Sequence, residues 1–76
     1  MKITIKKMIE EGQFDNDILY ALAKGLSYKE IILYTGLKKN YITYAINLLY
    51  KKYNAKNKMQ LVILAVQKGL IDINKI

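Results

Sequence analysis

Apolar residues recur at helical spacing along most of this 76-residue chain. Between residues 39 and 53 they fall every three or four positions, at Ile42, Ile46, Leu49 and Tyr53. That spacing places the side chains on one face of a helix. Residues 17–24 carry a similar stripe, and residues 58–68 are apolar nearly all round. The pattern predicts an all-α protein.

A capping box is predicted at the start of one short helix. The hydroxyl of Ser27 can accept a hydrogen bond from the amide of Glu30, whose carboxylate can reach back to Ser27. This helix is expected to continue to Tyr34 and to end at Gly36, about three residues before the helix over residues 39–53. Two helices joined by so tight a turn cross at a steep angle, which is the helix-turn-helix arrangement.

The other helices also have start and stop signals. Asp15 or Asn16 is expected to cap the helix over residues 17–24, and Asn57, with Gln60 three positions later, to cap the last one. Residues suited to left-handed backbone are expected to end the helices, at Gly12, Gly25, Gly36, Asn54 and Gly69. Residues 4–11 have helical spacing, although the sequence KITI just before is also compatible with a strand. Four main helices are predicted, with or without a short extra N-terminal element.

Composition narrows the possible chemistry. The chain has no Cys and no His, which excludes disulfides, thiolate nucleophiles and the usual zinc sites. Catalysis would need a carboxylate pair, and the acids at positions 10, 11, 15 and 17 are better explained as solvated or helix-start charges. There is no Gly-rich phosphate loop. We expect no enzyme, no metal and no cofactor.

No targeting or membrane segment is recognisable in the sequence. The longest apolar run covers only residues 61–66, far too few to span a bilayer. We expect a cytoplasmic protein without a membrane partner.

The net charge of +7 is unevenly distributed. Residues 1–30 contain five acids and five lysines, whereas residues 31–71 contain seven lysines and no acid. A solvated lysine face explains this segregation, but so does a polyanion partner, with duplex DNA first and an anionic membrane second. All thirteen basic residues are Lys. Because Arg is the commonest reader of guanine, A·T-rich sites are favoured.

Two stretches, LAKGLSYKEI and LKKNYITYAINLLYKKYNAKNKMQLVILAVQKGL, resemble the DNA-binding domain of the LuxR/GerE family of bacterial transcription regulators. The resemblance covers residues 14–71 without a gap. It implies a four-helix helix-turn-helix domain over residues 1–76, with residues 1–13 as an N-terminal extension. It also implies a stand-alone regulator without a sensor domain. Region four of sigma factors is the alternative for the fold.

The chain departs from the family pattern in the second helix of the helix-turn-helix motif, which is called the recognition helix. Lys38 replaces the usual Ser cap, Tyr41 replaces Thr, Thr43 replaces a basic residue and Ala45 replaces His. A second function therefore stays open, in which the domain pairs with, or inhibits, another LuxR-type regulator or RNA polymerase.

DNA contacts are predicted mainly on the recognition helix. Its N-terminal Lys38 and Lys39 are expected to contact phosphates, because this end of the helix enters the major groove. Lys51, Lys52, Lys56 and Lys58 are further candidates, as are the amides of Tyr28 and Lys29 beside the cap Ser27. Cations near a helix C-terminus also have a purely stabilising role. The residues expected to read bases are Asn40, Tyr41, Thr43, Tyr44 and Asn47.

A homodimer is predicted through the last helix. Leu61, Val62 and Ala65 can face the helix over residues 39–53, which leaves the opposite side in water in a monomer. The expected interface consists of Met59, Ile63, Val66, Gln67 and Leu70. Stacking of single-stranded bases on the seven tyrosines is a remote alternative, because most of them lie beside apolar stripes.

Overall fold

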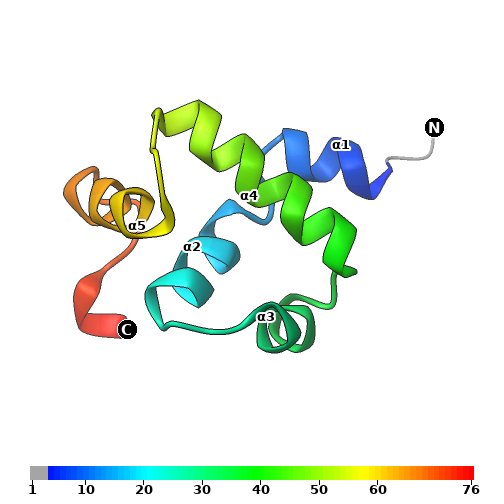
Figure 1. Ribbon diagram of the computed structural model, residues 1–76, viewed down its shortest axis with the longest axis horizontal. Helices are drawn as coiled ribbons and strands as arrows, with labels where there is room; N and C mark the ends of the chain where they lie inside the picture. The colour runs from blue at the N-terminus through cyan, green and yellow to red at the C-terminus, as the bar shows by residue number, and fades with distance from the viewer. Residues whose placement is uncertain (1–3) are drawn as a thin grey trace.

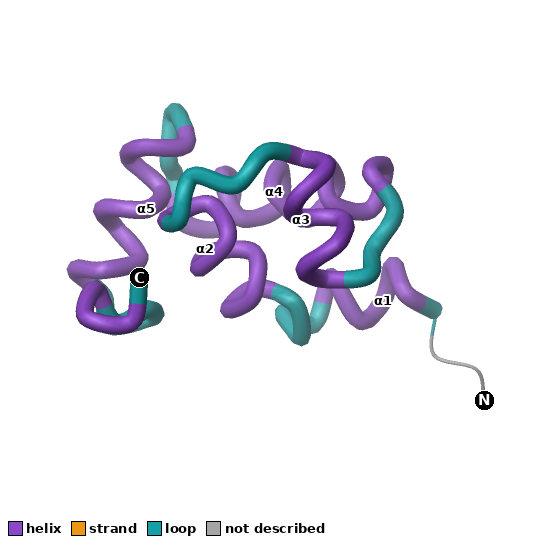
Figure 2. Tube along the Cα trace, turned by 90° about the horizontal axis from the view of Figure 1, so that it is seen from below, coloured by secondary structure: helices purple, strands orange, loops and turns teal. Residues whose placement is uncertain are grey.

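The computed structural model describes residues 4–76, which form five α-helices and a short 3-10 helix (Figure 1). They are α1 (Ile5–Glu10), α2 (Asp15–Ala23), α3 (Tyr28–Thr35), α4 (Lys39–Tyr53), α5 (Lys58–Gln67) and η1 (Ile73–Lys75). No strand occurs in these residues, and Figure 2 shows only helices and loops along the described trace. The prediction of an all-α protein is confirmed. Part of the KITI segment, residues 2 and 3, lies outside the described residues.

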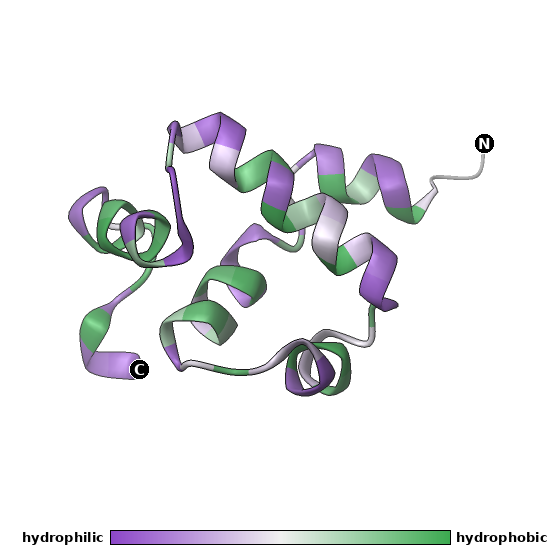
Figure 3. Ribbon diagram, in the orientation of Figure 1, coloured by the Kyte–Doolittle hydropathy of each residue, from purple (hydrophilic) through white to green (hydrophobic). Residues whose placement is uncertain are grey.

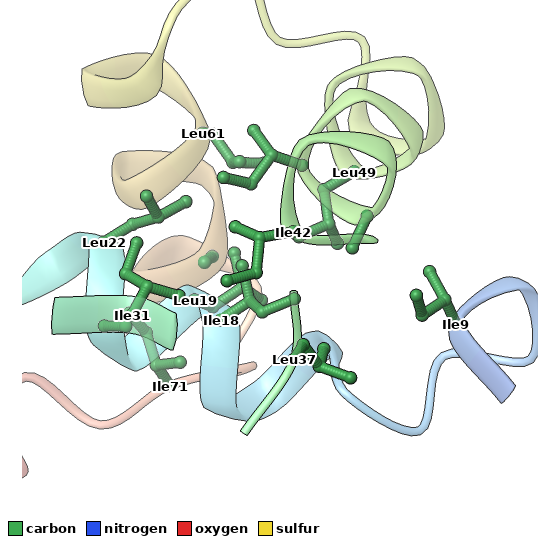
Figure 4. Packing of buried hydrophobic residues seen from close by; sticks show 14 residues of the cluster. Ile9, Ile18, Leu19, Leu22, Ile31, Leu37, Ile42, Leu49, Leu61 and Ile71 are labelled. Carbon is green, nitrogen blue, oxygen red and sulfur yellow. The ribbon is translucent and has the colours of Figure 1, made fainter. Parts of the chain in front are cut away.

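The centre of the fold is α4. Its buried residues are Ile42, Ala45, Ile46 and Leu49, which confirms the predicted stripe, with Tyr53 half-buried at its end. Each of the other four α-helices packs against α4. Side chains from all five α-helices meet in one core, as Figure 4 shows for Ile18, Ile31 and Leu61. The tail adds Ile71 to this core.

Local interactions set both ends of α3 and so the turn into α4. The Ser27 hydroxyl accepts from the Glu30 amide at 3.3 Å, and the Glu30 carboxylate accepts from the Ser27 amide at 3.1 Å, so the capping box is confirmed. The second bond lowers the pKa of Glu30. Gly36 ends α3 with φ of +76°, where a Cβ would be strained, and Leu37 is buried. The start of α4 is thereby fixed relative to α3.

The start of α2 differs from the prediction. The helix begins at Asp15, two residues early, and its N-cap is Phe14, which offers no side-chain acceptor. The prediction that Asp15 or Asn16 caps this helix is wrong. The turn from α1 is already nearly helical at Phe14, so Asp15 lies inside the first turn. Its carboxylate pairs instead with Lys52, at 3.4 Å.

The predicted left-handed residues follow the helices. Positive φ angles occur at Gly12, Gly25, Gly36, Asn54 and Gly69. The Asn57 side chain caps α5 by accepting from the Gln60 amide at 2.8 Å, as predicted. The tail after Gly69 was not predicted to fold, yet the Asp72 amide donates to the Tyr20 hydroxyl at 2.8 Å and η1 follows. None of the helices in residues 4–76 is both long and apolar enough to cross a membrane.

Replacing Ser27 with Ala should lower the free energy of unfolding by roughly 0.5–2 kcal/mol, because the Glu30 amide loses its acceptor. Urea unfolding followed by circular dichroism measures the change. The control is Thr43→Ala at an exposed position of α4, which should stay within about 0.5 kcal/mol of the wild type. If Ser27→Ala is as stable as the wild type, the capping box does not stabilise α3.

Candidate nucleic-acid interface

One polar stripe of α4 faces solvent. It consists of Asn40, Thr43, Asn47 and Lys51, all of which are exposed. Their spacings of three and four residues place them on one face, opposite the buried stripe. Figure 3 shows the resulting alternation of hydrophilic and hydrophobic residues along α4. The predicted base-reading residues Asn40, Thr43 and Asn47 are therefore brought together on one accessible surface.

The N-terminus of α4 carries cations where most helices carry an acid or a polar cap. Lys38 is the N-cap residue and makes no side-chain capping bond, and the first turn contains no acidic residue. Both Lys38 and Lys39 are exposed. The Lys39 ammonium lies 5.9 Å from the centre of the Tyr28 ring. Positive charge at this end of a helix is unfavourable unless an anion is present.

A shallow cleft beside α4 gathers several of the predicted phosphate contacts. The cleft, about 140 Å³ in volume, lies between α3, α4 and α5, and its lining includes Ser27, Tyr28, Tyr50 and Lys58. Burial raises the pKa of the Tyr50 hydroxyl, and the interaction with Tyr28 adds to the shift. We call this side of α4 the α3 flank. The remaining candidates Lys29, Lys51 and Lys56 are exposed, the first on α3 itself.

The opposite side of α4, the α1 flank, differs from the prediction. Tyr44 was expected to point outward, but it is half-buried and its hydroxyl donates to the Glu10 carboxylate at 2.7 Å. Tyr41 is also half-buried against the core. The expectation of a free, outward-facing Tyr44 is wrong, because α1 packs on this side of α4 and its Glu10 engages the hydroxyl. Lys52 is exposed but paired with Asp15.

Electrostatics on the α1 flank follow from these contacts. The hydrogen bond to Glu10 raises the pKa of Tyr44, since it stabilises the protonated phenol. The electrostatic interaction with Tyr53 raises the pKa of Lys52, and the Asp15 carboxylate raises it further. The Lys52 ammonium therefore stays charged. The Lys6 ammonium also lies 5.5 Å from the centre of the Tyr44 ring.

The outer face of α5 is apolar and exposed. Leu61 and Ala65 are buried and Val62 is half-buried, as predicted for the side that faces the core. On the other side Met59 is 73% exposed and Ile63 50%. Of the rest of the predicted interface, Gln67 and Leu70 are exposed and Val66 is half-buried. The face is available to a second chain, and the dimer itself stays a prediction.

An apolar groove adjoins this face. Its volume is about 380 Å³, and it is lined by Ala23, Val62, Ile63, Val66, Gln67, Ile73 and Ile76. The contribution of Ile73 and Ile76 was not predicted from the sequence. Their three-residue spacing was visible, but their position beside α5 follows from long-range contacts of the tail, which are the buried Ile71 and the bond between Asp72 and Tyr20.

Residues 4–76 contain no group of three or more side chains that could hold a metal ion. Comparison of the chain with protein-family models, with curated proteins and with solved structures finds no match. What this surface binds is therefore inferred from its own residues.

Replacing Glu10 with Ala should lower the pKa of Tyr44 toward the ordinary tyrosine value of about 10, because the acceptor of the phenol proton is lost. An NMR titration of ring-labelled tyrosine follows each hydroxyl separately. Glu11→Ala removes an equal charge one residue away and should leave Tyr44 unchanged, and neither variant should affect Tyr50. An unchanged Tyr44 pKa in Glu10→Ala would show that the hydrogen bond does not persist in solution.

Proposed function

We propose that this protein is a small transcription regulator of the LuxR/GerE helix-turn-helix type that binds duplex DNA as a homodimer. The observation that carries the proposal is the exposed polar stripe of α4, which contains no carboxylate. It follows Lys38 and Lys39 at the helix N-terminus, where no side chain makes a capping bond. The tight connection from α3 to α4 supports a helix-turn-helix motif. The order of α2 to α5 agrees with the resemblance noted in the sequence.

In this proposal α4 is the recognition helix and lies in the major groove. Lys38 and Lys39 neutralise phosphates, which removes the cost of placing two cations at a helix N-terminus. Asn40 and Asn47 can each form paired hydrogen bonds with an adenine, and Thr43 can contact a thymine methyl group. A·T-rich sites suit this set better than G·C-rich ones.

The α3 flank supplies contacts to the neighbouring backbone. Ser27, Tyr28 and Lys58 share one cleft, and Lys39 lies beside it over the Tyr28 ring. The hydroxyl of Tyr28, the amides of Tyr28 and Lys29 and the Lys58 ammonium can all donate to phosphate oxygens. Contacts of this kind fix the orientation of the protein without reading sequence.

The homodimer is supported by the outer face of α5. Pairing two α5 helices about a twofold axis would bury Met59, Ile63 and the adjoining groove, which a monomer leaves in water. A twofold dimer also presents two recognition helices to two half-sites of a palindromic sequence.

The same groove favours a second candidate function. A protein-interaction module would use the groove and the α5 face to bind another regulator or RNA polymerase rather than a second copy. The recognition-helix residues that differ from the family pattern, such as Lys38 and Tyr41, are the further observation in its favour.

Duplex binding should depend strongly on salt. If a dimer neutralises about six to ten phosphates, the affinity should fall by roughly 10³–10⁵ between about 50 and 200 mM salt. Replacing both Lys38 and Lys39 with Ala should weaken binding to all sequences alike and flatten the salt dependence. The melting temperature should be unchanged or slightly higher, because two cations leave a helix N-terminus. Fluorescence anisotropy with labelled duplexes measures the affinity.

The matched control removes two lysines outside this surface, Lys7 and Lys75. It should keep a salt slope close to that of the wild type. If the Lys38/Lys39 double variant binds as the wild type does, these residues do not contact phosphate. If the wild type binds no duplex even at low salt, the DNA-binding function is wrong.

Ile63→Lys should break the dimer, because it places a charge at the centre of the predicted interface. Light scattering after size exclusion should show a monomer, and circular dichroism should show an intact helical fold. Val66→Lys should have the same effect on the dimer. The matched control is Leu33→Lys on α3, which removes an even more exposed apolar side chain, 79% exposed, and should remain dimeric. A wild type that is monomeric at high micromolar concentration would contradict the homodimer and favour a different partner.

A further inference from the structure

The two flanks of α4 differ in whether their phosphate-binding groups are engaged by other residues. On the α3 flank Lys39 and Lys58 form no ion pair among the described residues, whose one salt bridge joins Lys52 to Asp15. On the α1 flank two groups that could donate to phosphate are already engaged by carboxylates. Tyr44 donates to Glu10 at 2.7 Å, and Lys52 lies 3.4 Å from Asp15.

We propose that α1, the turn after it and Asp15, the first residue of α2, form a displaceable cover that competes with DNA for the α1 flank. The inference rests on the proposed function. Tyr44 and Lys52 are two turns apart on α4, about 12 Å at 1.5 Å per residue, and the two carboxylates occupy both ends of this row. Each carboxylate stands where a phosphate oxygen would receive the same hydrogen bond or ion pair. In the free protein both donors of the row are therefore already engaged by carboxylates, although Lys52 remains exposed.

Attachment of the cover is weak enough to be reversed. With six residues, α1 is far too short to be stable by itself, so it forms only while it packs on α4. Ile9 is its one buried residue. A shallow surface cleft of about 140 Å³ lies beside this contact and is lined by Ile9, Leu48 and Lys52. Lys52 itself is exposed, and exposed pairs of this kind contribute little to stability.

The negative charge of the cover opposes DNA binding at this flank. Glu10 ends α1 beside Tyr44, Asp15 begins α2 beside Lys52 near the C-terminus of α4, and Glu11 lies in the turn between them. A phosphate backbone that approaches this flank is repelled by these carboxylates, which offset the attraction of Lys52. Release of α1 would free the hydroxyl of Tyr44 from Glu10, and movement of the adjoining turn would free Lys52 from Asp15. Anything that holds α1 away from α4 would then increase DNA affinity.

Two matched pairs of variants test the cover. Glu10→Ala and Asp15→Asn remove the carboxylates that hold Tyr44 and Lys52. Glu11→Ala and Asp17→Asn remove equal charges from neighbouring positions that hold neither group. All four substitutions remove a negative charge and so reduce the repulsion of DNA. Only a larger gain in DNA affinity in the first pair than in the second therefore reports on the cover. We expect an excess of about two- to fivefold in affinity per protomer, the scale of one exposed polar contact.

The salt dependence gives a second, independent readout. In Asp15→Asn the freed Lys52 should gain a phosphate, which steepens the slope of log affinity against log salt by about 0.9 per protomer. In Glu10→Ala the freed Tyr44 is neutral, so affinity should rise without a steeper slope than in Glu11→Ala. Amide hydrogen exchange in the wild type should show α1 less protected with duplex bound than without it.

The outcomes separate the two proposals. If all proteins bind duplex but each test variant matches its control, or if α1 stays equally protected in the complex, the cover is wrong and DNA binding stands. If neither the wild type nor any variant binds duplex at low salt, both proposals are wrong.

Discussion

Burial of one face of α4 is the constraint on which the rest of the structure depends. Every other α-helix packs against this face or its margins, and Ile42, Ile46 and Leu49 lie in the middle of the core. Apolar burial is the dominant favourable term in folding. Because the buried face fixes the rotation of α4 about its own axis, the opposite polar face is presented to solvent as a rigid surface. Geometry of the candidate interface therefore follows from the core.

Local signals were enough to predict much of this arrangement from the sequence. The Ser27 capping box, the glycine after α3 and Asn54 after α4 set helix ends through interactions within a few residues, and all three are present. Helical periodicity correctly predicted that Ile42 is buried and Asn40 is exposed. The start of α2 was predicted wrongly because an Asp at a helix start serves equally well as a cap or in the first turn, and the chain is already nearly helical at Phe14, which places Asp15 inside the helix.

Contacts between distant parts of the chain could not be predicted in this way. Glu10 and Tyr44 are 34 residues apart and Asp15 and Lys52 are 37 apart, so their meeting depends on how α1 packs on α4. The hydrogen bond from Asp72 to Tyr20 joins positions 52 apart. These three contacts change the character of two candidate sites. The first two occupy one flank of α4, and the third lies where the tail turns back and places two isoleucines in the groove beside α5.

The left-handed residues after the helices have a consequence for the speed of folding. Gly12, Gly25, Gly36, Asn54 and Gly69 reverse the chain within a few residues of each helix, in a sequence that contains no proline. Short reversals bring successive helices together while they are close in sequence, and a topology of such local contacts folds in microseconds to milliseconds. Without an X–Pro bond there is no slow isomerisation step. Nascent chains of this protein should reach the folded state almost as soon as the last helix is available.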